Sequence, residues 1–219
     1  MRVLIACEFS GVVRRAFANH GHFAVSCDLL PGEGLQGEPG DHASIRQWGI
    51  HYQGSVFDLV QGDSMLFMEN GGFDLMIAHP PCTFLCNSGV RWLYLDGKKY
   101  NGIDKNRWRE MEDAAQFFLD VQSLPIKKKC LENPVMHGHA KAIIKMEATQ
   151  TIQPHGYGHG EIKATQLYLD GLPNLVETDK VEGRDPRVHH ASPGPDRWKE
   201  RSRTLPGIAQ AMAEQWGTA

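Results

Sequence analysis

Apolar residues fall in short continuous runs, and turns or helix-like segments separate these runs. Residues 3–7, 24–28 and 73–78 have the length and composition of buried strands, and residues 51–58 give a weaker strand pattern. Residues 12–17 place apolar side chains at helical spacing after the first strand. Strands that alternate with helices favour a mostly parallel sheet. We therefore predict an α/β fold with a doubly wound, mostly parallel, Rossmann-like sheet.

The second half of the chain continues this alternation. Residues 108–119 place apolar side chains on one helical face, residues 129–131 form a further strand, and residues 140–146 form another helix. The runs 149–152 and 164–169 have the pattern of late strands. No internal repeat interrupts the order, so we predict a single domain over residues 1–219.

The composition is that of a soluble globular protein, with 41% hydrophobic and 22% charged residues. No apolar stretch approaches the roughly 18 residues that span a bilayer, and the short apolar start predicts a strand and not a signal peptide. We therefore expect a cytoplasmic protein. The five cysteines are odd in number and irregularly spaced, which indicates reduced thiols. A net charge of −3 means that any nucleic-acid binding must come from a local basic patch.

Four residues whose side chains can take part in catalysis or binding lie at the ends of predicted strands. Glu8, Asp28, Cys82 and Glu132 lie just after a predicted strand or at its end, and His79-Pro80-Pro81 stands between the strand and Cys82. Because the carboxyl ends of parallel strands meet at one edge of a sheet, we expect these side chains to converge there. Ligands of open α/β sheets bind at this edge.

Cys82 and Glu132 are the two residues whose chemistry is most specific. Two prolines precede Cys82, and their fixed φ angles aim its side chain as a nucleophile requires. The alternative is a small buried cysteine without a reactive role. Glu132 could protonate a ring nitrogen as a general acid, or it could be an ordinary acid at a helix start or in a loop.

These residues belong to motifs that resemble a known family. Pro80-Pro81-Cys82, followed 50 residues later by Glu132-Asn133-Pro134, resembles the nucleophile and acid motifs of the DNA cytosine-C5 methyltransferases. Phe9-Ser10-Gly11 resembles the first cofactor motif of this family, and the tail that begins at Thr204-Leu205-Pro206 resembles its last motif. In its compactness the chain is similar to the short cytosine methyltransferase-like proteins of phages.

The resemblance implies an S-adenosylmethionine-dependent methyltransferase fold and a covalent mechanism. The Cys82 thiolate would add to C6 of a flipped cytosine in DNA, and Glu132, followed by Asn133, would hydrogen-bond or protonate N3. The methyl group would come from S-adenosylmethionine, which leaves as S-adenosylhomocysteine. Lys163 is a candidate replacement for the family's ordering cluster. Cys86 is not expected to be the nucleophile, because the family usually has a small polar residue at that place.

The resemblance also implies a cofactor site around the first strands. Gly11 would admit the backbone close to the methionine part of the cofactor, and the following helix N-terminus would face its carboxylate. Asp28 would accept from the ribose hydroxyls, as an acid does in dinucleotide-binding sheets. The chain has Val12-Val13 where the family has further glycines. The full set of predicted cofactor residues is Glu8, Phe9, Ser10, Gly11, Asp28, Ser55, Asp58 and Pro80.

Basic and aromatic residues alternate after Cys82, which suits phosphate contact and base stacking, although a solvated surface loop has the same composition. A second, weaker basic stretch lies within the irregular region of about residues 171–204, which could serve as a reduced target-recognition element. The predicted nucleic-acid contacts are Arg91, Trp92, Lys98, Lys99, Arg107, Arg201 and Arg203.

Three other functions stay open at this stage. Amino-methyltransferases hold an exocyclic amine with a polar-Pro-Pro-aromatic tetrad, and His79-Pro80-Pro81-Cys82 has cysteine at the aromatic place. A non-catalytic DNA-binding or anti-restriction protein could keep the same fold, and a one-carbon transferase could act on free cytidine nucleotides. The histidines lack standard metal-ligand spacing, so no metal is expected.

Overall fold

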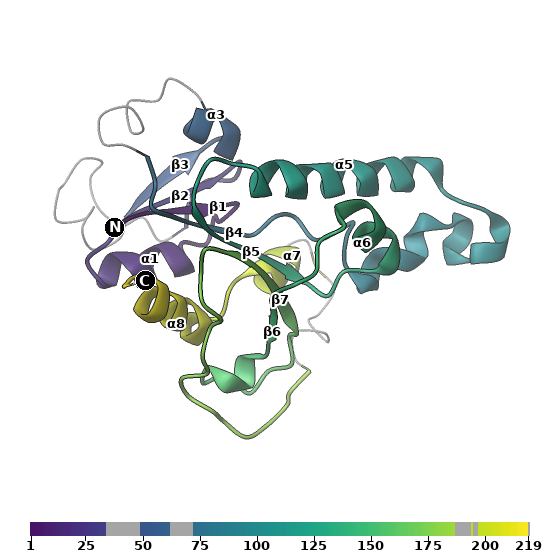
Figure 1. Ribbon diagram of the computed structural model, residues 1–219. Helices are drawn as coiled ribbons and strands as arrows, with labels where there is room; N and C mark the ends of the chain where they lie inside the picture. Colours follow the sequence, from purple (N-terminus) through teal and green to yellow (C-terminus); the bar gives the residue numbers. More distant parts are fainter. Residues whose placement is uncertain (34–48, 62–71, 187–193, 195–196, 219) are drawn as a thin grey trace.

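The core of the protein is one seven-stranded sheet in the order β3-β2-β1-β4-β5-β7-β6 (Figure 1). The computed structural model describes residues 1–33, 49–61, 72–186, 194 and 197–218. Strands β1 to β5 are parallel, and β7 runs antiparallel to both of its neighbours. The strands are β1 (Arg2–Ala6), β2 (Phe23–Asp28), β3 (Ile50–Gln53), β4 (Leu75–Ala78), β5 (Lys128–Pro134), β6 (Gln150–Ile152) and β7 (Thr165–Asp170).

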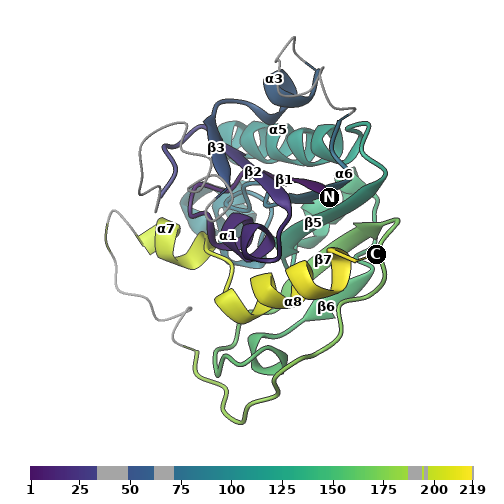
Figure 2. The ribbon, with the colours of Figure 1, turned by 90° about the vertical axis from the view of Figure 1, so that its left-hand side faces the viewer.

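Helices cover both faces of this sheet. Helices α3, α5 and α6 lie on one face, and α1 and α8 lie on the other (Figures 1 and 2). The helices are α1 (Val12–Asn19), α3 (Val56–Gln61), α5 (Lys105–Gln122), α6 (Gly138–Ile144), α7 (Arg197–Ser202) and α8 (Pro206–Trp216), with the short 3-10 turns η1 (Asn87–Leu93), η2 (Leu95–Gly97), η3 (Lys99–Asn101) and η4 (Pro154–Gly156). The doubly wound, mostly parallel, Rossmann-like sheet predicted from the sequence is confirmed.

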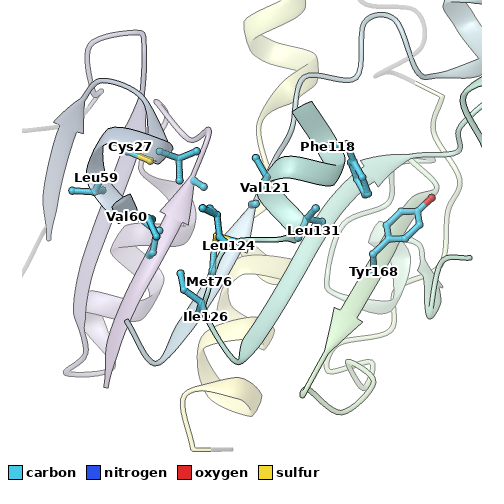
Figure 3. Packing of buried hydrophobic residues seen from close by; sticks show 14 of the residues in the cluster. Cys27, Leu59, Val60, Met76, Phe118, Val121, Leu124, Ile126, Leu131 and Tyr168 are labelled. Carbon is cyan, nitrogen blue, oxygen red and sulfur yellow. The ribbon is translucent and has the colours of Figure 1, made fainter. Parts of the chain in front are cut away.

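The continuous apolar runs are explained by the two covered faces. Along β1, Val3 and Ile5 pack toward α1 and α8, whereas Leu4 and Ala6 pack toward α5, and all four are fully buried. Figure 3 shows the α5 side of the core, where Phe118 meets the strand residues. A strand buried on both sides needs apolar residues at every position, which is the pattern seen in the sequence.

Three predicted elements differ in their bounds. The weak strand 51–58 is divided into β3 and α3, because the Ser55 hydroxyl accepts the Phe57 backbone N–H at 3.2 Å and caps the helix start. Strand β5 is longer than predicted, since β7 pairs with it as far as Pro134. Glu132 therefore lies inside β5, although the parallel pairing of β5 with β4 ends one residue earlier, at Leu131. The irregular region 171–204 contains α7.

Candidate active site at the carboxyl ends of the strands

The polar residues that follow β1, β4 and β5 meet at one edge of the sheet, as the sequence predicted. Ala6 of β1 is paired with Ala78 of β4, and Ala78 is paired with Leu131 of β5. The residues beyond these pairs therefore leave the sheet side by side. The charges of Glu8 and Glu132 both act on His79, and the charge of Glu132 also acts on the Cys82 thiol.

The turn that carries Cys82 is held from both sides. The Asn133 side-chain amide donates to the Pro80 carbonyl at 3.0 Å. The Cys82 carbonyl accepts the backbone N–H groups of Leu85 and Cys86, each at 3.0 Å. Asn133 is buried, and its hydrogen bond fixes the turn at Pro80. The partly buried Cys82 thiol is thereby presented in one orientation, as a nucleophile requires.

Cys86 is part of this site, which the sequence analysis did not anticipate. Its thiol is hydrogen-bonded to the Cys82 thiol and lies 3.0 Å from the Ser88 hydroxyl. The hydrogen bond from Cys82, with further donors from Ser88 and Gly89, lowers the pKa of Cys86 to about 5. The same hydrogen bond, together with burial, raises the pKa of Cys82. The spacing of one helical turn between the two cysteines was the available signal in the sequence.

Glu132 forms a buried ion pair with His79. The Glu132 Oε2 atom lies 2.5 Å from His79 Nδ1 and accepts the Thr204 hydroxyl at 3.2 Å. Burial alone would raise the pKa of Glu132, but the charge and hydrogen bond of His79 lower it to about 2. Burial would lower the pKa of His79, and Glu132 reverses this and raises it. Each partner therefore favours the charged form of the other, carboxylate for Glu132 and imidazolium for His79. His79 was identified from the sequence only as part of the Pro80 motif.

Lys163 lies within reach of the same groups. Its ammonium donates to the Arg203 carbonyl at 2.9 Å. Its charge contributes to the lowered pKa of Glu132 and partly opposes the rise in the pKa of Cys82 that the Cys86 hydrogen bond and burial cause. A cation at this place favours the thiolate and the carboxylate. The structure therefore brings Cys82, Glu132 and Lys163, which were predicted separately, into one cluster.

An apolar cavity of about 200 Å³ opens beside this cluster, at the ends of β1, β2 and β3. Asp28 and Ser55 supply polar side chains to its wall, while Cys7, Pro81 and Phe117 supply apolar surface. Two predicted cofactor residues thus line one cavity. Asp58 is exposed on α3 and does not line it.

The helix N-terminus expected to face the cofactor carboxylate already holds a carboxylate of the protein. Glu8 accepts the backbone N–H of Val13 at 2.7 Å and that of Arg14 at 3.3 Å, and it is buried. Glu8 therefore caps α1, and two of the N–H groups at this helix start are already hydrogen-bonded within the protein. Gly11 has a φ of 66°, and a side chain there would collide with the Arg14 guanidinium, so glycine is needed for the turn itself.

Phe9 and Ser10 are buried in the loop between β1 and α1 and do not line the cavity. The Phe9 ring lies 5.9 Å from the ring of Trp198 and 5.8 Å from the guanidinium of Arg203. Arg203 in turn forms an ion pair with Glu33 at 2.6 Å. These contacts pack the segment around α7 onto the first loop. Glu33 and Arg203 are 170 positions apart, and a single sequence contains no information that two such distant residues are in contact.

The basic and aromatic segment after Cys82 forms a projecting arm, which we define as residues 87–104. The arm lies at the end of α5 farthest from β1, at the right of Figure 1. Trp92 is 49% exposed, with the Arg91 guanidinium 4.2 Å from its ring centre, and Tyr100 is 81% exposed. Arg91, Lys98 and Lys99 are exposed on the same arm.

The other predicted cations are packed against the protein or partly buried. Arg107 stacks on the Phe84 ring at 4.0 Å and pairs with Glu110 at 3.5 Å. Arg201 is partly buried on α7. These cations, with Arg203, therefore lie outside the exposed basic set of the arm.

Within residues 1–33, 49–61, 72–186 and the described C-terminal part, no three His, Cys, Asp or Glu side chains are grouped as metal ligands. No helix in the described part of the chain has the length and apolar character needed to cross a membrane.

The order of the strands, with a reversed β7 beside β5, gives this protein the Rossmann-like fold of the S-adenosylmethionine-dependent methyltransferases. No protein-family model matches the chain, and no curated protein matches it.

Two solved structures resemble the fold distantly. The first is a candidate DNA modification methyltransferase encoded within an E. coli prophage, with 15% identity and a TM-score of 0.46 over 88% of this chain. The second is WbdD in complex with the kinase inhibitor LY294002, with 14% identity and a TM-score of 0.39 over 80% of this chain. The chain spans 55% and 37% of these proteins, respectively. At this level of identity and superposition they identify neither a substrate nor a reaction for this chain.

Proposed function

We propose that this protein is a DNA cytosine-C5 methyltransferase that uses S-adenosylmethionine and forms a covalent adduct through Cys82. The observation that carries the proposal is the placement of one thiol and one buried carboxyl group at adjacent strand ends. Cys82 follows β4, Glu132 lies near the end of β5, and the charge of Glu132 acts on the Cys82 thiol. The addition of a thiolate to a flat pyrimidine needs a nucleophile and a proton donor at neighbouring positions.

Each residue of the cluster has a separate role in the proposed reaction. The Cys82 sulfur, as a thiolate, adds to C6 of cytosine, and Lys163 nearby favours the thiolate. Glu132 contacts N3 and the exocyclic amine, where charge develops during the addition. Once C5 has received the methyl group, a base removes the C5 proton and the bond between sulfur and C6 breaks. Asn133 keeps the Pro80 turn in place throughout.

The adenosine half of S-adenosylmethionine fits the cavity at the ends of β1 to β3. Asp28 offers a carboxylate to ribose hydroxyls, Ser55 offers a hydroxyl to the base, and Pro81 and Phe117 form apolar walls. When bound, the cofactor supplies an electrophilic methyl group. Because Glu8 already caps α1, the amino-acid half of the cofactor must be recognised by groups other than the α1 N-terminus. A DNA substrate implies a location in the cytoplasm of a bacterial or phage-infected cell.

The projecting arm is the proposed DNA contact. Lys98 and Lys99 are placed to meet phosphates, and the exposed rings of Trp92 and Tyr100 are placed to stack on bases. The arm follows directly after the Cys82 turn in the chain, so the proposed DNA contact is joined to the loop that carries the thiol.

The test is incubation with labelled S-adenosylmethionine and an oligonucleotide that contains 5-fluorocytosine. Fluorine at C5 prevents release of the thiolate, so the adduct accumulates and can be seen as a labelled protein–DNA band. The band should vanish in Cys82→Ala and persist in Cys86→Ala, which removes the neighbouring thiol only. Peptide mass analysis of the adduct should place the modification on Cys82.

Four results would contradict the proposal. An adduct lost in Cys86→Ala but kept in Cys82→Ala would make Cys86 the nucleophile. A methyl group found on an exocyclic nitrogen would indicate an amino-methyltransferase. Methylation of free cytidine monophosphate in preference to the oligonucleotide would replace DNA with a nucleotide as the substrate, and DNA binding without any transfer would indicate a non-catalytic protein.

A further inference from the structure

His79 is a buried titratable residue to which the cytosine reaction, as described above, gives no part. Its backbone N–H donates to the Ala6 carbonyl at 2.9 Å, which fixes the residue at the end of β4. Its Nδ1 atom lies 2.5 Å from Glu132 Oε2, while its Nε2 atom is buried and has no hydrogen-bond partner in the described part of the chain. Buried polar atoms in proteins are nearly always paired, so an orphaned ring nitrogen beside a reactive thiol calls for a function.

The two oxygens of Glu132 are used differently. Oε2 accepts hydrogen bonds from His79 Nδ1 and from the Thr204 hydroxyl. Oε1 has no hydrogen-bond partner among the described residues and is not among the fully buried unpaired atoms. The carboxyl group is thus anchored through one oxygen and presents the other toward the site. Anchoring of this kind is how an outer partner sets the direction of an acting residue.

We infer that His79 is a positioning residue that acts through Glu132, holding the carboxyl group in place and storing the proton that the pyrimidine N3 takes when the thiolate adds to C6. This inference rests on the proposed cytosine chemistry. The proton balance is simple: the pair of imidazolium and carboxylate holds the same number of protons as neutral imidazole and carboxylic acid. When the pair gives one proton to N3 through the Glu132 carboxyl group, it becomes neutral imidazole and carboxylate. It regains the proton when N3 releases it as the bond between sulfur and C6 breaks.

A lone glutamic acid could not store this proton at neutral pH. Its ordinary pKa of about 4.3 would leave it ionised, and a general acid works best when its pKa is near the working pH. In the pair, the stored proton is lost only when the pH rises through the pKa of the imidazole. Glu132 raises this pKa above its usual range. The pair therefore holds its proton below that pKa and loses it as the pH rises through it.

Three charged groups act on His79, and each comes from a different element. Glu132 of β5 and Glu8 of the β1 loop favour the imidazolium, while Lys163, from the segment before β7, opposes it. The Cys82 thiol, from the turn after β4, faces Glu132 and Lys163. Thr204 adds a neutral hydrogen bond to Glu132. The two carboxylates outnumber the one cation, which is the arrangement that a protonated imidazole needs.

The first experiment needs no turnover. Imidazole nitrogens of ¹⁵N-histidine-labelled protein are followed by NMR against pH in the full chain, with assignment by His79→Asn. We expect both ring nitrogens of His79 to stay protonated to a pH above 6.5, and we expect Glu132→Gln to lower the midpoint. His20→Gln is the matched control, because His20 lies at the C-terminal end of α1, away from Glu8 at the N-terminal end. This variant should leave the midpoint of the His79 titration unchanged.

The second experiment compares methyl transfer by the wild type, His79→Asn and His79→Ala over pH 5 to 9. Asparagine can still donate a hydrogen bond to Glu132 Oε2, but it stores no proton. We expect His79→Asn to move the descending limb of kcat against pH to lower pH and to reduce kcat at pH 7.5 by roughly 10²–10⁴-fold, the range of general-acid contributions. KM for DNA should change little. If His79→Asn does not fold, the NMR titration of His79 in the wild type and in Glu132→Gln decides in its place.

The outcomes separate this inference from the proposed function. A neutral His79 at pH 7, or a His79 midpoint that is indifferent to Glu132→Gln, overturns the inference without touching methylation. An unchanged descending limb in His79→Asn, with methylation of cytosine C5 intact, also overturns it. If the NMR result is as expected but the wild type transfers no methyl group to C5, the proposed function fails and the catalytic part of the inference fails with it.

Discussion

The ion pair between Glu132 and His79 should contribute measurably to folding, and a double-mutant cycle can isolate its contribution. The pair lowers the pKa of Glu132 from its ordinary value of 4.5 to about 2. At about 1.4 kcal/mol for each tenfold change in acidity, this amounts to about 3 kcal/mol of stability. Both side chains are nearly buried, with 12% and 9% exposure, so solvent screening reduces the value little.

The sign of the pH dependence follows from the two pKa directions. The contribution of Glu132 is fully present above pH 4.5 and is lost as the pH falls toward 2, because its pKa in the folded protein is depressed. The contribution of His79 is fully present below pH 6.5 and is lost as the pH rises through its raised pKa. The pair should therefore stabilise the fold most between about pH 4.5 and 6.5.

The assay is urea unfolding at pH 6 and at pH 9 of the wild type, His79→Asn, Glu132→Gln and the double variant. We expect a coupling energy of about 3 kcal/mol at pH 6 and a smaller one at pH 9. Such a loss would leave each variant folded, because domains of this kind have about 5–15 kcal/mol of stability.

The exposed pair of Arg107 and Glu110, whose glutamate is 53% exposed, is the matched control and should couple by less than about 1 kcal/mol. If the losses from the two single variants of the buried pair simply add, the pair does not act as a unit, and the reasoning from its pKa values is refuted.

The other predictions concern the first turn, the second thiol and the projecting arm. Gly11→Ala should destabilise the fold by about 1–2 kcal/mol, since alanine is strained at a φ of 66°; thermal unfolding measures this, and an unchanged Tm would contradict it. Alkylation of Cys86 by iodoacetamide should be half-maximal near pH 5 and should shift to higher pH in Cys82→Ala; a midpoint near 9 in the wild type would show that the two thiols do not share a proton. Replacing Lys98 and Lys99 by alanine should reduce the slope of log affinity for DNA against log salt by about 2, and an unchanged slope would remove the arm from the interface.

The strands and the position of the site could be predicted from the sequence because their signals are local. A strand buried on both faces must be apolar at each position, so β1, β2 and β4 appear as continuous runs. The polar residues that follow these runs mark the edge where ligands bind, which is why Cys82, Asp28 and Glu132 could be chosen. The cap formed by Glu8 has a local signal as well, an acid just before a helix, although a cofactor role was assigned to it.

Only the tertiary structure decided which of these side chains meet. His79 and Glu132 are 53 residues apart, and Thr204 reaches Glu132 from 72 residues away, so their contacts depend on how β4, β5 and the segment before α8 pack together. The ionisation of the site depends on the same packing, because a pKa responds to burial and to neighbouring charges within a few ångströms. A single sequence records which groups can titrate; the distances that set their protonation exist only in the folded chain.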